Sequence, residues 1–182
     1  MTVFFTADHH FGHANVIAFQ DRPWPAIADH DAGLIDCWNA VVGPTDVVYH
    51  LGDFAYRTSR EHAQGVFNRL NGVKHFIRGN HDKSWVDSLG WASVNDIAQI
   101  SVEGARIVLC HYAMRVWPGD RRGAVMLYGH SHGRLSGNSQ SLDVGVDCWG
   151  FTPASWSQIR DRLATLPPRL PPEDDDALAQ GV

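Results

Sequence analysis

Three short apolar runs in the first half of the chain predict β-strands, and each run ends in a polar segment. Between them, apolar residues at helical spacing and the stop signal Gly43-Pro44 predict helices. This alternation is typical of crossover units, which place successive strands parallel in one sheet. The predicted strands cover residues 2–7, 46–51 and 73–77, and the predicted helices cover residues 29–42 and 58–70, the second opened by a Thr58-x-x-Glu61 capping box.

The second half of the chain has a different pattern, in which short strands follow one another before a last helix. Glu103-Gly104 separates two apolar runs and predicts a hairpin with a two-residue turn. Thr152-Pro153 predicts the cap and the first turn of a helix that continues to about Leu163. The predicted strands cover residues 97–102, 105–110, 125–128 and 141–146.

The length of the chain, 182 residues, predicts one α/β domain, which we place over residues 1–165. From Leu166 onward the sequence is rich in proline and acidic residues. Such a composition buries too little apolar surface to fold, so residues 166–182 are predicted to form a disordered tail.

The formal net charge is −5, from 20 acidic and 15 basic residues. A protein that binds long nucleic acid by neutralising phosphates has the opposite sign, so no such partner is expected. No apolar stretch approaches the ~20 residues of a membrane span, and the N-terminus lacks the layout of a signal peptide. Three cysteines without a C-x-x-C pair indicate a reduced protein, which we expect in the cytoplasm, and nothing indicates an obligate protein partner.

Five of the predicted strands are followed within three residues by residue types that bind metals. In open α/β sheets, the carboxyl ends of the strands are where ligands bind. A lone histidine at a strand end is more often a hydrogen-bonded surface residue than a ligand, but five strand ends together favour a metal site. The residues concerned are Asp8, His10, Asp53, Asn80, His81, Asp82, His111, His130 and His132.

Two pairs of these residues, Asp8/His10 and His130/His132, are spaced two positions apart. In extended chain this spacing points both side chains to one face, so each pair is expected to reach one metal centre. Carboxylate, amide and imidazole ligands without thiolates suit manganese, iron, zinc or nickel, and they argue against a structural zinc site.

The same residues form an ordered series of motifs that resembles the calcineurin-like metallophosphoesterases, in a small form of the bacterial and phage type. The resemblance implies a four-layer sandwich of two mixed β-sheets flanked by helices, with the metals at loops on one edge. The motifs are Asp8-x-His10, Gly52-Asp53, Gly79-Asn-His-Asp82, a lone His111 and Gly129-His-x-His132.

The resemblance also implies roles for these residues. A first divalent metal ion, with manganese favoured, would take Asp8, His10, Asp53 and His132, and a second would take Asp53, Asn80, His111 and His130. Asp53 would bridge the two ions through its two oxygens, and a shared water would attack the phosphate. His81 would protonate the leaving oxygen or steady the transition state, and Asp82 would orient the His81 ring.

Five further residues are candidates for contacts with substrate. Arg57 belongs to a Gly-Asp-x-x-x-Arg pattern similar to that of serine/threonine protein phosphatases, where the arginine holds phosphate, and Arg78 precedes Gly-Asn-His as it does in those enzymes. His13 lies close to the first motif. Arg115 and Trp117 belong to a loop over residues 113–124 that is suited to holding a phosphate and stacking a base.

The predicted function is therefore hydrolysis of phosphate esters by a dinuclear metal centre, with small phosphodiesters of nucleotide type as substrates. Two alternatives stay open at this point, and a third is set aside. A phosphomonoesterase would use the same site, and a non-catalytic metal-binding module would keep the fold. Asp8-His-His10 also spells the motif of the DHH phosphoesterases, but that family places it well inside a longer chain.

Overall fold

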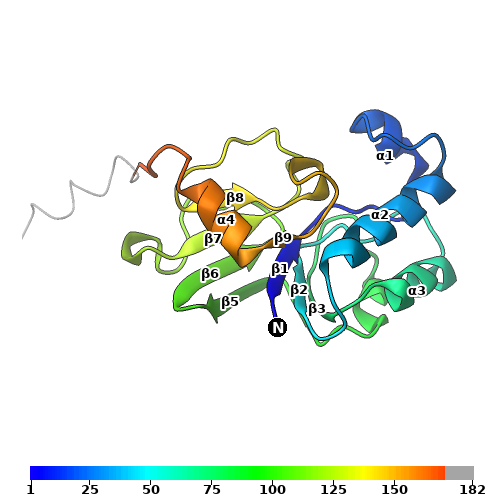
Figure 1. Ribbon diagram of the computed structural model, residues 1–182, viewed down its shortest axis with the longest axis horizontal. Coiled ribbons are helices and arrows are strands. Elements are labelled where there is room, and N and C mark those ends of the chain that lie inside the picture. The colour runs from blue at the N-terminus through cyan, green and yellow to red at the C-terminus, as the bar shows by residue number, and fades with distance from the viewer. Residues whose placement is uncertain (171–182) are drawn as a thin grey trace, which may run out of the picture.

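The structure is a computed structural model, described here over residues 1–170, with two β-sheets packed face to face and helices on the outside (Figure 1). The helices are α1 Ala14–Phe19, α2 Ile27–Val41, α3 Arg60–Arg69 and α4 Trp156–Leu163, with single 3₁₀ turns η1 Ser84–Ser88, η2 Asp120–Arg122 and η3 Val146–Cys148. The strands are β1 Val3–Thr6, β2 Val47–His50, β3 Val73–Ile77, β4 Ser93–Asn95, β5 Ile97–Val102, β6 Ala105–Cys110, β7 Val125–Tyr128, β8 Ser141–Asp143 and β9 Ala154–Ser155.

Both sheets are mixed, which agrees with the predicted fold class. The first has the order β4-β3-β2-β1-β9, with β1 to β4 parallel and β9 antiparallel to β1. The second has the order β5-β6-β7-β8, in which only β5 and β6 are antiparallel. The parallel crossovers place the carboxyl ends of β1, β2 and β3 side by side at one edge of the first sheet.

Alternation of side chains along the strands builds two apolar cores. Phe4 of β1 packs in a cluster with Trp38 of α2 and Phe67 of α3 on the outer face of the first sheet. The next residue, Phe5, points to the other face and shares a cluster with Leu109 of the second sheet and with residues of α4. Because the side-chain period of a strand is two, β1, β2 and β3 each contribute to both cores.

The outer face of the second sheet is covered by the loop over residues 113–124. Trp117 is buried there against Val108 and Met126. Its indole N–H donates to the carbonyl of Ala124 at 2.8 Å. The loop therefore serves as a packing layer for the sheet, and Trp117 is unavailable for stacking on a substrate.

Two helix starts differ from the sequence-based predictions. Helix α3 is capped by Ser59, whose hydroxyl accepts the backbone N–H of His62, and Thr58 is not the cap. Helix α4 begins after Ser155, which forms a capping box with Gln158, and residues 154–155 pair with β1 instead of extending the helix from Pro153. In both places a serine nearer the helix supplies the oxygen that the first turn requires.

The folded part of the chain continues beyond the predicted domain boundary at residue 165. Leu166 packs against the core between the sheets, and the Pro167 carbonyl accepts the backbone N–H of Ser139 at 2.8 Å. Arg169 pairs with Asp120 at 2.7 Å. The predicted tail therefore cannot begin at Leu166. Its remainder, residues 171–182, lies outside the described residues.

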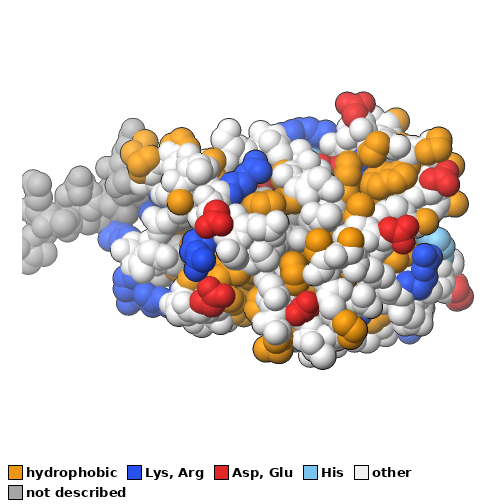
Figure 2. Space-filling model, viewed as in Figure 1, with side chains coloured by type: hydrophobic (Ala, Val, Ile, Leu, Met, Phe, Trp, Pro, Cys, Tyr) orange, Lys and Arg blue, Asp and Glu red, His pale blue; other side chains and the backbone are white. Residues whose placement is uncertain are grey.

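The surface has the character expected from the composition. Acidic and basic side chains are interspersed on the face shown in Figure 2, without a continuous basic stripe on that face. Among the described residues, no helix combines the length and the apolar character needed to cross a bilayer.

Candidate metal centre

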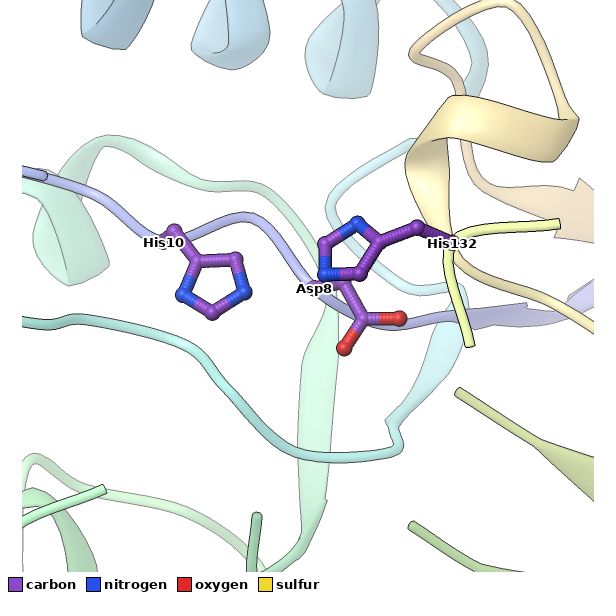
Figure 3. A group of neighbouring side chains, drawn as sticks. All are labelled: Asp8, His10 and His132. Carbon is purple, nitrogen blue, oxygen red and sulfur yellow. The ribbon is translucent and has the colours of Figure 1, made fainter. Parts of the chain in front are cut away.

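Six of the seven predicted metal ligands lie in two groups beside each other at the carboxyl ends of the strands. Asp8, His10 and His132 place one ligand atom each within 4.8 Å of the others, and Figure 3 shows Asp8 and His10 on one loop and His132 on another. We call them the first group. The second group has the same property and consists of Asp53, His111 and His130.

The Asp53 carboxylate lies between the two groups. Its Oδ2 atom is 3.5 Å from Nε2 of His10 and 3.6 Å from Nε2 of His111. Its Oδ1 atom accepts the backbone N–H of His81 at 2.9 Å. Of the two carboxylate oxygens, Oδ2 is therefore the one that faces both groups.

The backbone at the site is not extended. Asp8, His10, Asp53, His130 and His132 all have positive φ, between 48° and 66°. Such conformations are uncommon for residues with a Cβ and cluster at functional sites. The prediction that extended backbone points Asp8/His10 and His130/His132 each to one face is therefore wrong for both pairs. Asp8 and His10 do share a group, but His130 and His132 lie in different groups, as the resemblance implies.

The seventh predicted ligand, Asn80, belongs with the second group. Nδ1 of His111 donates to the backbone carbonyl of Leu51 at 2.7 Å, which fixes the tautomer of the neutral ring. Burial lowers the pKa of His111, so the neutral ring is favoured and its Nε2 has no proton. That atom faces Oδ1 of Asn80 at 3.0 Å. Two lone pairs at this distance fit a shared cation.

The first group also fits a cation. Both ring nitrogens of His10 are buried without a hydrogen-bond partner among the described residues, and burial, with His132 as the next cause, lowers the pKa of His10 well below its usual value. Burial raises the pKa of Asp8 well above its usual value, and the carboxylates of Asp53 and Asp143 add to the effect. A bound divalent cation would satisfy the ring and neutralise these carboxylates.

Two motif glycines permit the close approach of the site loops. A Cβ at Gly79 would lie 2.3 Å from the backbone nitrogen and from Oδ1 of Asp53. A Cβ at Gly52, where φ is +93°, would lie 2.6 Å from Nδ1 of His111. The loops that follow β2, β3 and β6 can therefore meet around Asp53 only because these positions have no side chain.

His81 lies at the rim of the site. Its ring is half-buried, with its centroid 4.3 Å from the Tyr56 ring and 5.4 Å from the His10 ring. Only its backbone takes part in the Asp53 hydrogen bond. The side chain therefore borders the first group, and the backbone contacts Asp53, without His81 belonging to either group.

Asp82 does not orient the His81 ring. Its carboxylate accepts the backbone N–H groups of Asp53, Phe54 and Gly79 at 2.7, 2.9 and 2.9 Å. Burial raises the pKa of Asp82 to about 7, with the Asp53 charge as the next cause, against the lowering effect of these hydrogen bonds. The role predicted for Asp82 is thus replaced by a structural one, in which it ties the Asp53 loop to the loop after β3.

The two predicted phosphate-binding arginines have different surroundings. Arg57 is exposed, and its guanidinium lies 5.4 Å from the centroid of the Tyr56 ring, beside His81. Arg78 is engaged elsewhere, because it pairs with Asp87 at 3.0 Å and with Asp96 at 2.9 Å. Hydrogen bonds to Asp96 and Asp87 raise the pKa of Arg78. Arg57 stays available to a phosphate, whereas Arg78 supports the loop behind the site.

The other predicted substrate contacts separate in the same way. The His13 ring is half-buried, 5.9 Å from the His10 ring, so it borders the first group. Arg115 is exposed on the loop over residues 113–124. Trp117 is buried in that loop, as described above, so the prediction that it stacks a base is wrong.

Sequence reasoning missed two tyrosines at the site, Tyr56 and Tyr112, and an ion pair. Tyr112 follows His111 directly, is 47% exposed, and packs its ring 4.8 Å from that of His130. The ion pair joins Arg22 to Asp147 at 2.8 Å, and Asp147 accepts Nδ1 of His132 at 2.6 Å. Burial tends to raise the pKa of Asp147, but hydrogen bonds from His132 and Arg22 lower it. The one sequence signal for these residues was the aromatic Tyr112 beside the predicted ligand His111.

A carboxylate–imidazole centre at the edge of two stacked mixed sheets defines the class of protein. The chain belongs to the calcineurin-like phosphoesterase superfamily, whose domain model matches residues 1–161. This family is metal-dependent and consists of hydrolases. Its membership agrees with the fold and with the two candidate ligand groups.

Individual relatives extend over most of the chain. The Gene 66 protein of Mycobacterium phage D29 is 30% identical over 179 residues, covering 81% of this chain and 88% of the phage protein. An uncharacterised protein of Methanocaldococcus jannaschii is 29% identical over 165 residues, covering 86% of this chain and 88% of its own. A solved structure of a protein of unknown function from Aquifex aeolicus has a TM-score of 0.69 at 22% identity, covering 89% of this chain and 98% of that one, and it shares the fold.

Proposed function

We propose that this protein hydrolyses phosphodiesters of nucleotide type with two divalent metal ions, which we propose to be manganese. The observation that carries the proposal is the position of Asp53 Oδ2, which faces His10 of the first group and His111 of the second. Two adjacent ligand groups that share one carboxylate oxygen are suited to a pair of cations.

The first ion would be held by Asp8, His10, Asp53 and His132, and the second by Asp53, Asn80, His111 and His130. Two bound divalent ions supply the activation of water and the neutralisation of charge on the phosphoryl oxygens. His81 projects beside both groups without belonging to them, and we assign it the donation of a proton to the leaving oxygen. Arg57, exposed beside His81, is placed to bind a phosphate oxygen.

Aromatic side chains on two sides of the centre favour a nucleotide over a simple phosphate ester. Tyr112 packs on His130 of the second group, and Tyr56 packs on His81. Aromatic rings provide stacking platforms for bases, worth about 1–3 kcal/mol per base. The substrate that we propose is therefore a small nucleotide-type diester, and the three free cysteines support a reducing compartment such as the cytoplasm.

The test uses two nitrophenyl diesters that share a leaving group, one with a thymidine 5′-phosphate moiety and one with a methyl group, and nitrophenyl phosphate as the monoester. We expect the thymidine diester to have the highest kcat/KM with Mn²⁺. Tyr112→Ala should lower kcat/KM for the thymidine diester by about tenfold and leave the methyl diester nearly unchanged. Tyr112→Phe is the matched control, because it keeps the ring.

Preference for the monoester would contradict the diesterase proposal and favour a phosphomonoesterase. An equal effect of Tyr112→Ala on both diesters would contradict base stacking. Turnover of none of the three substrates, in protein that binds metal, would favour a non-catalytic metal-binding module.

A further inference from the structure

We propose that Arg22 and Asp147 are positioning residues that hold the first group in the geometry needed to bind a divalent cation. The inference rests on the proposed function only for the presence of that cation. Neither residue belongs to a motif discussed above, and they lie 125 positions apart in the chain. The structure brings them together directly behind His132 and the backbone of Asp8.

Arg22 uses its entire donor capacity in this network. Its side chain is 0% exposed, and Nε and Nη2 donate to the two oxygens of Asp147 at 2.9 and 2.8 Å. Nη2 also donates to the carbonyl of Asp8 at 2.7 Å, and Nη1 donates to the carbonyl of His9 at 2.8 Å and to Nε2 of His30 at 2.9 Å. A guanidinium has five N–H groups, and all five have an acceptor here.

The contacts to the carbonyls of Asp8 and His9 place Arg22 against the strained segment of the first group. Asp8 and His10 both have positive φ, so this segment needs support from outside to keep its conformation. The buried guanidinium of Arg22, which donates to two consecutive carbonyls, provides that support. The charge of the same guanidinium is balanced by Asp147.

Asp147 transmits this support to a predicted metal ligand. Its Oδ2 atom lies 2.6 Å from Nδ1 of His132, and because a carboxylate only accepts, His132 carries its proton on Nδ1. Nε2 of His132 is then the atom with a lone pair, and it points toward the first group. Partners of this kind fix the ring orientation of metal-bound histidines and raise their basicity.

The far side of Arg22 is fixed by helix α2. Nδ1 of His30 lies 2.8 Å from Oδ1 of Asp31, and Asp31 also accepts the backbone N–H of Gly12 at 3.0 Å and pairs with His62 at 2.7 Å. The guanidinium is therefore held between α2 and the loop after β8.

Within residues 1–170, the second group has no equivalent ion pair behind it. His111 is oriented by a neutral backbone carbonyl, and the exposed His130 side chain has ring contacts but no hydrogen bond among the described residues. Loss of Arg22 or Asp147 should therefore affect the first group selectively.

The test is titration of the metal-free protein with Co²⁺ alone. Calorimetry measures the affinity of each binding event, and visible absorption reports the coordination of each bound ion. Asp147→Asn is nearly isosteric and should weaken one of the two binding events by about 10–100-fold, with a changed spectrum for that event only. Arg22→Lys should have a similar one-sided effect, because lysine has three donors and no planar fork.

Asp120→Asn is the matched control. Asp120 is 14% exposed and pairs with Arg169 at 2.7 Å, whereas Asp147 is 11% exposed and pairs with Arg22 at 2.8 Å. The control therefore removes a similar ion pair at a place that does not contact either ligand group. We expect it to leave both Co²⁺ affinities and both spectra unchanged, while thermal unfolding of each metal-free variant verifies that it folds.

The outcomes distinguish this inference from the proposed function. Two binding events in the wild type that are both unchanged in Asp147→Asn and Arg22→Lys would overturn the positioning role and leave the two-metal proposal standing. An equal loss at both events would also overturn it, because it would indicate a general structural role. Absence of any Co²⁺ binding by the wild type would overturn the two-metal proposal itself, together with this inference.

Discussion

Oδ2 of Asp53 lies 3.5 Å from Nε2 of His10, across the boundary between the two ligand groups. The other carboxylate oxygen is held by the backbone N–H of His81, so the orientation of Asp53 is fixed by the chain. A single oxygen atom is thereby presented to both groups. Substitutions at Asp53 should consequently affect both cations together.

Asp53→Asn is expected to lower metal content from two ions per chain to below one, because both ions lose a shared anionic ligand. The amide keeps the size of the side chain and its acceptor for His81, so the fold should persist. The measurement is metal analysis after dialysis, with circular dichroism to verify folding. The control is Asp96→Asn, because Asp96 is an exposed carboxylate that pairs with Arg78. Retention of two ions by Asp53→Asn would contradict a shared ligand.

His81→Ala is expected to keep both metals and the fold while lowering kcat by roughly 10²–10⁴, the usual worth of general acid catalysis. The deficit should be smaller for a nitrophenyl diester than for a diester with an alkyl leaving group, because a nitrophenolate departs without a proton. The measurement is kcat on both diesters. Equal deficits would show that His81 stabilises phosphoryl charge instead, and loss of metal would show that it is a ligand.

Asp82→Asn should destabilise the protein by about 1–3 kcal/mol, because a half-buried carboxylate that accepts three backbone N–H groups is replaced by an amide with one acceptor oxygen. Urea unfolding of the metal-free protein measures this change. Asp87→Asn, which removes a surface partner of Arg78, should cost less than about 1 kcal/mol and serves as the comparison. Similar values for the two variants would refute the structural role of Asp82.

Stability should fall in acid, partly because of His50. Burial lowers the pKa of His50 from 6.5 to about 3, so between these pH values the unfolded chain binds a proton that the folded chain does not. The stability that comes from keeping His50 neutral is fully present above pH 6.5 and is lost as the pH falls toward 3. Over this range the free energy of unfolding falls by up to ~1.4 kcal/mol per pH unit.

His50→Gln removes this titration and retains a hydrogen-bonding group for Nδ1 of His9, which lies 2.9 Å from Nε2 of His50 in the native protein. The dependence of unfolding free energy on pH should therefore be shallower in the variant, even if its stability at neutral pH is lower. Urea unfolding of the metal-free proteins across this pH range measures it. Parallel curves would show that His50 does not titrate as the structure implies.

The sequence predicted the strands that carry the site because their apolar runs are short and end in polar motifs. Asp8, Asp53 and His111 each lie within three residues of the end of a strand, so topology alone placed them near one another. The sequence could not predict the positive φ values at Asp8 and His10, because those depend on contacts from other loops. For this reason the extended-chain argument failed even where the grouping was correct.

Other features depend on long-range contacts that leave no local pattern. Arg22 and Asp147 are far apart in the chain, and neither sits in a periodic or turn motif. Asp82 was assigned to its sequence neighbour, His81, but its hydrogen bonds reach backbone groups of Asp53, Phe54 and Gly79. Trp117 was predicted to stack a base because its loop is polar, yet its ring packs on the outer face of the second sheet.

Manganese titration of chelator-treated protein, with turnover of the thymidine nitrophenyl diester recorded at each step, tests the two-metal account most directly. The account predicts negligible activity without metal, because water is a poor nucleophile at neutral pH, and recovery that becomes complete only when two ions are bound per chain. Full activity in the metal-free protein, or complete recovery at one ion per chain, would contradict it.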